Sequence, residues 1–261
     1  MLLLKDKSVV ITGAGSGVGR AASLIFAQHG ARVVCSDLKE EWAAETVRQV
    51  VEAGGTAVAQ VCDVRREADL IAAIERAVAE FGRLDIMYNN AGVATATDGK
   101  GHRLVDQGDD DFDRMVSINQ RGVYYGCRQA VMRFQIQGDH QGVIVNTASV
   151  AGMVGMGGVL YGSTKGAVIQ LTRALAIEVA KDGIRVNAVC PCGMLTNFGR
   201  SDERAFGSVS AEHVDRINKM HPLGRAITPE DTANAALFLA SDMAKNITGV
   251  ALPVDGGYTA A

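Results

Sequence analysis

The sequence has 261 residues, of which 48% are hydrophobic and 21% are charged, and its formal net charge is −3. This composition indicates a folded globular protein, and the weakly acidic charge argues against a surface for nucleic acid or anionic membranes. No apolar run approaches the ~20 residues of a membrane span, and the first one is too short for a signal peptide. The five cysteines lack zinc-finger or redox spacing, which favours reduced thiols and no metal site. We therefore expect a cytoplasmic protein.

The first predicted element is a short β-branched strand over residues 8–12. It leads into the glycine loop Gly13-Ala14-Gly15-Ser16-Gly17-Val18-Gly19, and a helical stretch at 21–29 follows. A strand, a glycine loop and a helix in this order favour a dinucleotide site, because glycines let the backbone approach a pyrophosphate and the helix N-terminus supplies amide donors. A glycine-rich turn without a ligand is the alternative.

The second predicted strand, residues 31–36, ends at Asp37, which follows Gly17 by 20 residues. A carboxylate there can accept hydrogen bonds from the adenosine ribose diol and repels a 2′-phosphate. No Arg or Lys lies in the glycine loop before Gly19. Both observations favour NAD over NADP, although Asp37 can also cap the helix that starts near Glu40.

Further strands are predicted at 56–62 and 84–88, with a helix at 67–81 between them. Asp63 and Val64 close the third strand, where Asp63 is expected either to accept from the adenine amino group or to cap the next helix. The turn-prone Asn89-Asn90-Ala91-Gly92 follows the fourth strand. Strands that alternate with helices predict a single-domain α/β fold, a Rossmann-type doubly wound parallel sheet with helices on both faces.

The second half continues this pattern, with a polar loop at 95–111 and a helix from about 110 to 135. Asn119 lies among apolar neighbours in that helix and needs a hydrogen-bond partner. The remaining strands, at 142–147, 184–190 and 250–254, bring the total to seven. Residues 197–221 are polar and irregular, with a helical piece near 211–220, and a last helix covers 228–240. Insertions of this kind commonly form lids, so we expect a substrate lid over about 191–221.

Tyr161 and Lys165 are four residues apart on a predicted helix and share one face. A phenol is a poor base at neutral pH, but a neighbouring ammonium lowers its pKa. Ser149, after the fifth strand, can polarise an alcohol or carbonyl oxygen. These side chains predict a proton-transfer device for an alcohol and its ketone. Tyr-x-x-x-Lys alone is a weak motif, for which an ordinary amphipathic helix is the better interpretation.

The motifs together resemble the short-chain dehydrogenase/reductase family over essentially the whole chain. The matching residues are Thr12-Gly13-x3-Gly17-x-Gly19, Asp63-Val64, Asn89-Asn90-Ala91-Gly92, Asn119, Ser149, Tyr161-x-x-x-Lys165 and Pro191-x4-Thr196.

The resemblance implies a role for each residue. Tyr161 would be the general acid/base and Ser149 would hold the substrate oxygen. Lys165 would bind the nicotinamide ribose and lower the pKa of Tyr161, and Asn119 would support a water-mediated proton relay. The residues implied to bind the dinucleotide are Gly13, Ser16, Gly17, Val18, Gly19, Asp37, Leu38, Asp63, Val64, Asn90, Gly92, Tyr161, Lys165, Pro191, Met194 and Thr196. The family also implies a homotetramer, built through the helices that bear Asn119 and Tyr161 and through the C-terminal strand.

Two departures from the family pattern concern the mouth of the site. Cys192 stands where glycine is usual, which would narrow the nicotinamide wall or make it oxidisable, although Gly193 can restore backbone freedom. Ser149 and Tyr161 are separated by 12 positions where 13 is common. The loop between them is therefore expected to be one residue shorter.

The sequence thus predicts an NAD(H)-dependent oxidoreductase that interconverts a secondary alcohol and a ketone. Apolar residues with flexible Met side chains favour a small to medium hydrophobic or cyclic substrate; the expected lining includes Val150, Met156, Leu195 and Phe198. Arg200, Arg204, His213 and Lys219 either meet an anionic substrate or are solvated surface.

Two other functions stay open. One is an NADPH-dependent 3-oxoacyl-thioester reductase, against which Asp37 and the net charge argue. The other is a dinucleotide-sensing binding protein without catalysis, against which the presence of Tyr161 and Lys165 argues.

Overall fold

The computed structural model describes residues 2–94, 103–138, 141–196, 198 and 211–260. Within these residues, seven parallel strands form one sheet in the order β3-β2-β1-β4-β5-β6-β7. The strands are β1 (Ser8–Thr12), β2 (Arg32–Asp37), β3 (Thr56–Val61), β4 (Ile86–Asn89), β5 (Gly142–Thr147), β6 (Ile184–Pro191) and β7 (Ala251–Val254). The order reverses between β1 and β4, and ligands bind outside the carboxyl ends of strands at such a point.

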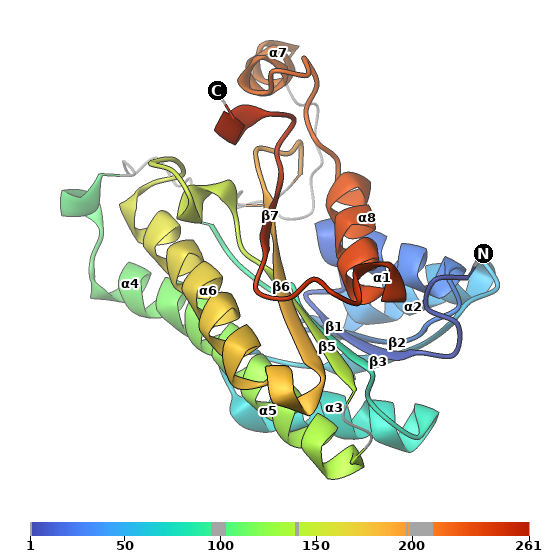
Figure 1. Ribbon diagram of the computed structural model, residues 1–261. Helices are drawn as coiled ribbons and strands as arrows, with labels where there is room; N and C mark the ends of the chain where they lie inside the picture. The colour runs from blue at the N-terminus through green and yellow to red at the C-terminus, as the bar shows by residue number, and fades with distance from the viewer. Residues whose placement is uncertain (1, 95–102, 139–140, 197, 199–210, 261) are drawn as a thin grey trace.

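Helices cover both faces of the sheet, with α1, α2 and α8 on one side and α3, α5 and α6 on the other (Figure 1). The helices are α1 (Gly17–Gln28), α2 (Glu40–Glu52), α3 (Glu67–Phe81), α4 (Asp109–Met115), α5 (Gly122–Gln137), α6 (Val159–Glu178), α7 (Ala211–Met220) and α8 (Pro229–Ala240). The predicted Rossmann-type doubly wound sheet of seven strands is confirmed.

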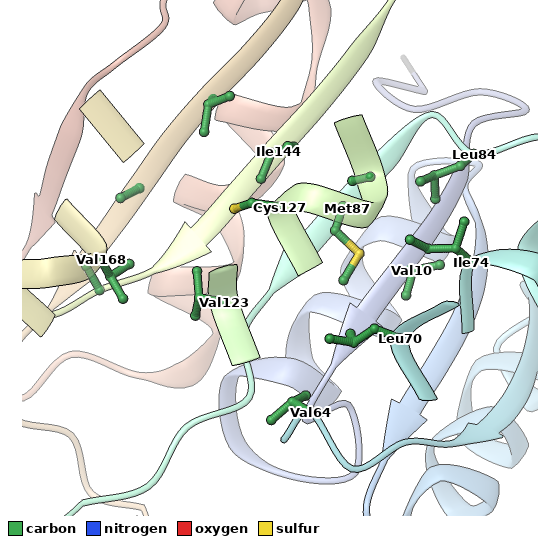
Figure 2. Packing of buried hydrophobic residues seen from close by; sticks show 14 of the residues in the cluster. Val10, Val64, Leu70, Ile74, Leu84, Met87, Val123, Cys127, Ile144 and Val168 are labelled. Atoms are coloured by element: carbon green, nitrogen blue, oxygen red, sulfur yellow. The ribbon is translucent and has the colours of Figure 1, made fainter. Parts of the chain in front are cut away.

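The core consists of two apolar clusters, one on each side of the sheet. Figure 2 shows the cluster under α3 and α5, which includes Val10 and Met87 of the central strands, Leu70 and Ile74 of α3 and Val123 of α5. All five are at most 3% exposed, and burying a side chain of this size contributes roughly 1.5–3 kcal/mol. This packing holds the strand ends in fixed positions beneath the site.

The predicted helix over 110–135 is interrupted. α4 and α5 are separated by a π-helical segment, Val116–Arg121, which contains Asn119. Segments of this kind are frequent at functional sites. Here the Asn119 amide bonds with the backbone of Val93, so the segment serves a tertiary contact that local propensity does not reveal.

The expected lid is described only in part. β6 ends at Pro191, a parallel bridge joins Met194 to Ile227, and α7 is present as predicted. Residues 197 and 199–210, with the candidate anion-binding residues Arg200 and Arg204, lie outside the described residues, as do residues 95–102 of the expected polar loop. In the described part of the chain, no helix combines the length and apolarity that crossing a bilayer requires.

Candidate active site

The glycine loop lies against the end of β4, at the reversal point of the sheet. Thr12 Oγ1 accepts the backbone N–H groups of Asn90 and Ala91, each at 3.1 Å, and Asn90 Nδ2 donates to Thr12 O at 3.1 Å. Gly13 has a φ of 64°, and a Cβ there would stand 2.9 Å from Ala91 Cα. Glycine is therefore required at position 13 for the strand ends to meet.

The start of α1 fits the phosphates of a dinucleotide. Ser16 is the N-cap, but its side chain makes no capping hydrogen bond. Gly17 is exposed, with a φ of 47°, and a Cβ there would meet no protein atom within 4 Å. The amide end of the helix is therefore open to an anion. Val18 is half-buried, while Gly19 is buried so closely that a Cβ would stand 2.0 Å from Gly13 O.

Asp37 connects the end of β2 to the glycine loop. Its Oδ2 accepts the Gly15 N–H at 2.9 Å, and its Oδ1 accepts the Lys39 N–H at 3.1 Å. Lys39, not Asp37, is the N-cap of α2, and its side chain makes no capping hydrogen bond. Its neighbour Leu38 is 58% exposed. The structure thus places a carboxylate beside the loop, as the ribose interpretation requires.

Asp63 is paired with a neighbouring arginine and does not cap α3. Arg65 Nε donates to Asp63 Oδ1 at 2.8 Å and Arg65 Nη2 donates to Oδ2 at 2.5 Å. These bonds hold the pKa of Asp63 below its ordinary value. The cap interpretation is wrong, because the N-cap of α3 is Arg66 and has no side-chain capping bond. The adjacent Val64 is 8% exposed and packs against Gly122 of α5.

Asn119 has the partners that its buried position demands. Oδ1 accepts the Val93 N–H at 2.8 Å, while Nδ2 donates to Val93 O at 2.8 Å and to Thr164 Oγ1 at 3.3 Å. Thr164 belongs to α6, next to Lys165. A Cβ on Gly92 would stand 3.3 Å from Asn119 Oδ1 and 3.4 Å from Lys165 Nζ. Asn119 therefore lies close to the lysine, as the relay requires.

Lys165 is 2% exposed, and its Nζ donates to Thr147 O at 2.8 Å. Burial lowers its pKa to about 8, opposed by interaction with the Cys190 thiol. Because the pKa still exceeds 7, the amine is mostly protonated at neutral pH. The structure thus holds a cation inside the protein at the end of β5.

Tyr161 and Ser149 are joined by a side-chain hydrogen bond in the same site. Ser149 Oγ accepts the Ala151 N–H at 3.1 Å and donates to Pro191 O at 3.3 Å. Burial raises the pKa of Tyr161 to about 12, opposed by a hydrogen bond with Ser149. Lys165 Nζ lies 5.8 Å from the centre of the Tyr161 ring. Desolvation therefore raises the pKa of Tyr161 in this structure, where the neighbouring Lys165 was expected to lower it.

A buried polar network positions α6, and the sequence analysis missed two of its members, Asn146 and Thr172. Asn89 Nδ2 donates to Asn146 Oδ1 at 2.9 Å, and Asn146 Nδ2 donates to Thr172 Oγ1 of α6 at 3.0 Å. Gly126 of α5 makes room for this chain, since a Cβ there would stand 1.9 Å from Asn89 Oδ1. Asparagines inside two apolar strands were the signal that could have revealed it.

The expected substrate residues divide into three groups. Phe198 is 51% exposed, and its ring meets that of Tyr161 edge-on at 6.0 Å. Met156 and Leu195 are half-buried. Val150 is completely buried in the core, which leaves it no surface toward a ligand.

A cavity of about 500 Å³ lies between α7, the loop after Ser149 and the C-terminal segment; it is lined by Val154, Lys219, Met220, Pro222, Tyr258 and Thr259. Figure 1 shows α7 beside this end of the chain. Asp255 ties the segment down, because its Oδ2 accepts Thr259 N at 2.8 Å and Thr259 Oγ1 at 2.6 Å. Lys219, a candidate for an anionic substrate, pairs with Asp215 at 2.7 Å. The C-terminal wall was not predicted, because no motif marks it.

The unusual Cys192 is only 7% exposed, and its backbone N–H donates to Val254 O at 3.1 Å. Burial raises the pKa of its thiol, so oxidation is disfavoured. Gly193 does not adopt a left-handed conformation and supplies no compensating backbone freedom.

The loop between Ser149 and Tyr161, which is one residue shorter than usual, ends in two glycines with left-handed backbone. Gly157 and Gly158 have φ values of 75° and 88°. Thr196 Oγ1 accepts the Phe198 N–H at 3.3 Å.

Comparison with known proteins gives matches along the chain. A family model described as enoyl-(acyl carrier protein) reductase matches residues 13–259. A 3beta-hydroxysteroid dehydrogenase 2 of Eggerthella lenta is 36% identical over 263 residues, covering 99% of this chain and 96% of that protein. A cyclohexanol dehydrogenase of an Acinetobacter species is 36% identical over 255 residues, covering 97% and 95%. The crystal structure of gox2181 superposes with a TM-score of 0.88 at 30% identity, covering 100% and 98%.

Fold, site and relatives define an oxidoreductase that acts on alcohols or ketones. The chain belongs to the short-chain dehydrogenase/reductase family, which uses nicotinamide dinucleotide cofactors.

Proposed function

We propose that this protein is an NAD(H)-dependent oxidoreductase that interconverts a secondary alcohol and a ketone of small to medium size, hydrophobic or cyclic. The observation that carries the proposal is the meeting of Ser149, Tyr161 and the buried Lys165 at the carboxyl ends of β5 and β6. This arrangement offers a proton donor and a cation around one position for a substrate oxygen.

In alcohol oxidation, the substrate hydroxyl hydrogen-bonds to Ser149 Oγ and Tyr161 Oη. When bound, the nicotinamide supplies the acceptor for the substrate hydride. Tyr161 takes the hydroxyl proton as general base and returns a proton in the reverse direction. The charge on Lys165 favours the phenolate, and Asn119 holds the backbone of Val93 in place beside it.

NAD is supported over NADP by the position of Asp37. The Gly15 and Lys39 amides orient its carboxylate at the glycine loop. A fixed negative charge at this place accepts the ribose hydroxyls and repels a 2′-phosphate.

The substrate class is supported by the apolar surroundings of Tyr161. Phe198 contacts its ring, and two further apolar side chains are half-buried, namely Met156, five residues before Tyr161, and Leu195, three residues before Phe198. The relatives named for cyclohexanol and for a 3β-hydroxysteroid both carry ring alcohols in their names. The lid over about 191–221 belongs to this proposal as the segment that closes over the substrate.

A second candidate is an NADPH-dependent 3-oxoacyl-thioester reductase, which gains weight from the acyl-carrier-protein description of the matching family model. The orientation of Asp37 opposes it, since such a reductase must accommodate a 2′-phosphate. A preference for NADPH would therefore decide for this candidate.

The proposed assembly is a homotetramer, and the proposed compartment is the cytoplasm. Large apolar side chains are exposed on α4, α5 and α6: Phe112, Tyr124, Met132, Ile136 and Ile177 are 45–79% exposed. Such side chains support burial against other copies of the chain. The five cysteines are buried and free, which suits a reducing compartment.

The test is an initial-rate screen of secondary alcohols and ketones with NAD(H) and NADP(H), beside Tyr161→Phe. Turnover of cyclic alcohols with NAD, reduced at least a hundredfold in the variant, is the expected result. A strong NADPH preference would refute the role of Asp37. Binding of NADH without any turnover would favour a non-catalytic sensor.

A further inference from the structure

We propose that Tyr88 is a positioning residue for the dinucleotide, because its buried hydroxyl begins a directed hydrogen-bond chain through Thr147 to Asn90 and the glycine loop. The inference rests on the proposed function in one respect, namely that this loop binds a dinucleotide. Tyr88 itself lies in the middle of the sheet and is completely buried, so it does not act as a catalytic residue.

The hydrogen-bond chain starts at Tyr88 in β4 and crosses to Thr147 at the end of β5. Tyr88 Oη and Thr147 Oγ1 are 3.0 Å apart, and Thr147 Oγ1 is 3.1 Å from Asn90 Oδ1. Asn90 Nδ2 then donates to Thr12 O at 3.1 Å and to Gly13 O at 3.4 Å. One hydroxyl is thereby connected to the first glycine of the loop.

The direction of donation follows from the number of protons. Both protons of the Asn90 amide group go to backbone oxygens, so its Oδ1 faces Thr147 as an acceptor. Thr147 has a single hydroxyl proton and must donate it to Oδ1. Tyr88 must therefore donate to Thr147 Oγ1. Burial raises the pKa of Tyr88, which keeps the phenol protonated for this purpose.

Thr147 also contacts the catalytic lysine, since its backbone oxygen accepts Lys165 Nζ at 2.8 Å. Thr147 thus contacts Asn90, next to the dinucleotide loop, through its side chain, and it contacts Lys165 through its carbonyl oxygen. Without the Tyr88 hydroxyl, Thr147 Oγ1 loses the donor that orients and polarises it, so its hydrogen bond to Asn90 Oδ1 is weakened. The amide of Asn90 is then held less firmly against Gly13.

The ring of Tyr88 is held separately from its hydroxyl. It stacks on Phe26 of α1, with centroids 6.1 Å apart and planes inclined by 12°. Tyr88→Phe consequently removes the hydrogen bond and retains the packing. A buried hydroxyl is unfavourable unless it is hydrogen-bonded, so its presence beside Thr147 calls for a specific role.

The experiment is a titration of the full-length chain with NADH, read by energy transfer from Trp42, the only tryptophan. Trp42 is half-buried and adjoins the loop, because a Cβ on Gly15 would stand 2.6 Å from Trp42 Cβ. We expect Tyr88→Phe to raise the Kd about fivefold, the effect of one net hydrogen bond. In turnover, KM for the dinucleotide rises by a similar factor while kcat and KM for the alcohol change less than twofold.

Four further variants separate positioning from stability. Thr147→Val breaks the chain and should raise the Kd as Tyr88→Phe does, whereas Thr147→Ser keeps the hydroxyl and the wild-type Kd. The double variant Tyr88→Phe/Thr147→Val should have a Kd for NADH no higher than that of the weaker-binding single variant. The reason is that both substitutions break the same hydrogen-bond chain. Phe26→Leu loosens the same ring and should lower the Tm with an unchanged Kd.

A Kd within twofold of wild type in Tyr88→Phe overturns the inference, as does an equal rise in Phe26→Leu. Should Tyr88→Phe not fold, equal Kd values for Thr147→Val and Thr147→Ser overturn it instead. A wild-type chain that binds neither NADH nor NADPH overturns the proposed function and this inference with it. That outcome is distinguishable, because the failure then lies in the wild type.

Discussion

The amine of Lys165 donates a 2.8 Å hydrogen bond to the backbone oxygen of Thr147, so a buried cation on α6 is held by the last residue of β5. This contact fixes the lysine beside Tyr161, and it places the lysine where desolvation disfavours its charge. Function and stability therefore make opposite demands on position 165.

Lys165→Met should abolish turnover and stabilise the fold at pH 7. Burial lowers the pKa of Lys165 from 10.5 to about 8, which corresponds to about 3 kcal/mol of destabilisation at neutral pH. In Lys165→Met, the loss of the hydrogen bond to Thr147 O offsets about 1 kcal/mol of this stabilisation. We expect a net gain of about 2 kcal/mol in the free energy of unfolding, measured with urea.

The pH dependence of this gain has a definite sign. Below pH 8 the amine is protonated in both folded and unfolded chains, and the penalty is complete. Between pH 8 and 10.5 the unfolded chain binds more protons, so the wild type becomes more stable relative to Lys165→Met as pH rises. Lys181→Met, at an exposed lysine after α6, should show no such trend. A gain from Lys165→Met that is constant from pH 7 to 10 would contradict the assignment.

Asp37→Asn should shift the cofactor preference from NAD toward NADP. The change removes the negative charge that repels a 2′-phosphate and weakens acceptance of the ribose hydroxyls. We expect the ratio of kcat/KM for NAD to that for NADP to fall at least tenfold, about 1.4 kcal/mol. Glu41→Gln, an exposed acid in the first turn of α2, is the matched control. An unchanged ratio in Asp37→Asn would remove the argument for NAD.

Gly126→Ala should destabilise the protein by about 2 kcal/mol or more. The new Cβ would stand 1.9 Å from Asn89 Oδ1, inside the buried polar chain that positions α6. Gly166→Ala is the matched helical control, because the nearest atom to its Cβ would be Gly152 O at 3.7 Å. That variant should be neutral or up to ~1 kcal/mol more stable. Equal unfolding midpoints in urea for the two variants would show that the close approach at position 126 is unimportant.

Phe198→Ala should weaken the use of ring alcohols. Its edge-on contact with Tyr161 at 6.0 Å is of a kind that contributes about 0.5–1.5 kcal/mol. We expect KM for a cyclic alcohol to rise about threefold to tenfold, with a smaller effect for propan-2-ol, and Phe198→Leu should restore part of the loss. A KM that rises equally for both alcohols would indicate a general disturbance of the site.

The parallel, doubly wound sheet was predictable from strands that alternate with helices. The gathering of the motif residues was predictable too, because glycines, acids and asparagines at strand ends must meet at one edge of a parallel sheet. The contacts of Asp63 were not, since the choice between a helix cap and Arg65 depends on side-chain geometry. The raised pKa of Tyr161 was missed because it depends on burial, which a spacing of four residues does not measure. The cavity wall at Tyr258 joins segments that are distant in sequence, and no local pattern brings them together.

The fold-back of the last residues has a practical consequence for producing the protein. Asp255 holds Thr259, and both Tyr258 and Thr259 line the cavity. A purification tag fused at the carboxyl end would begin beside this cavity and obstruct it. A tag at the amino end starts from a different region of the molecule, because Figure 1 marks the N end near α1, apart from α7 and the C end. Recombinant material for kinetic work should therefore carry its tag there.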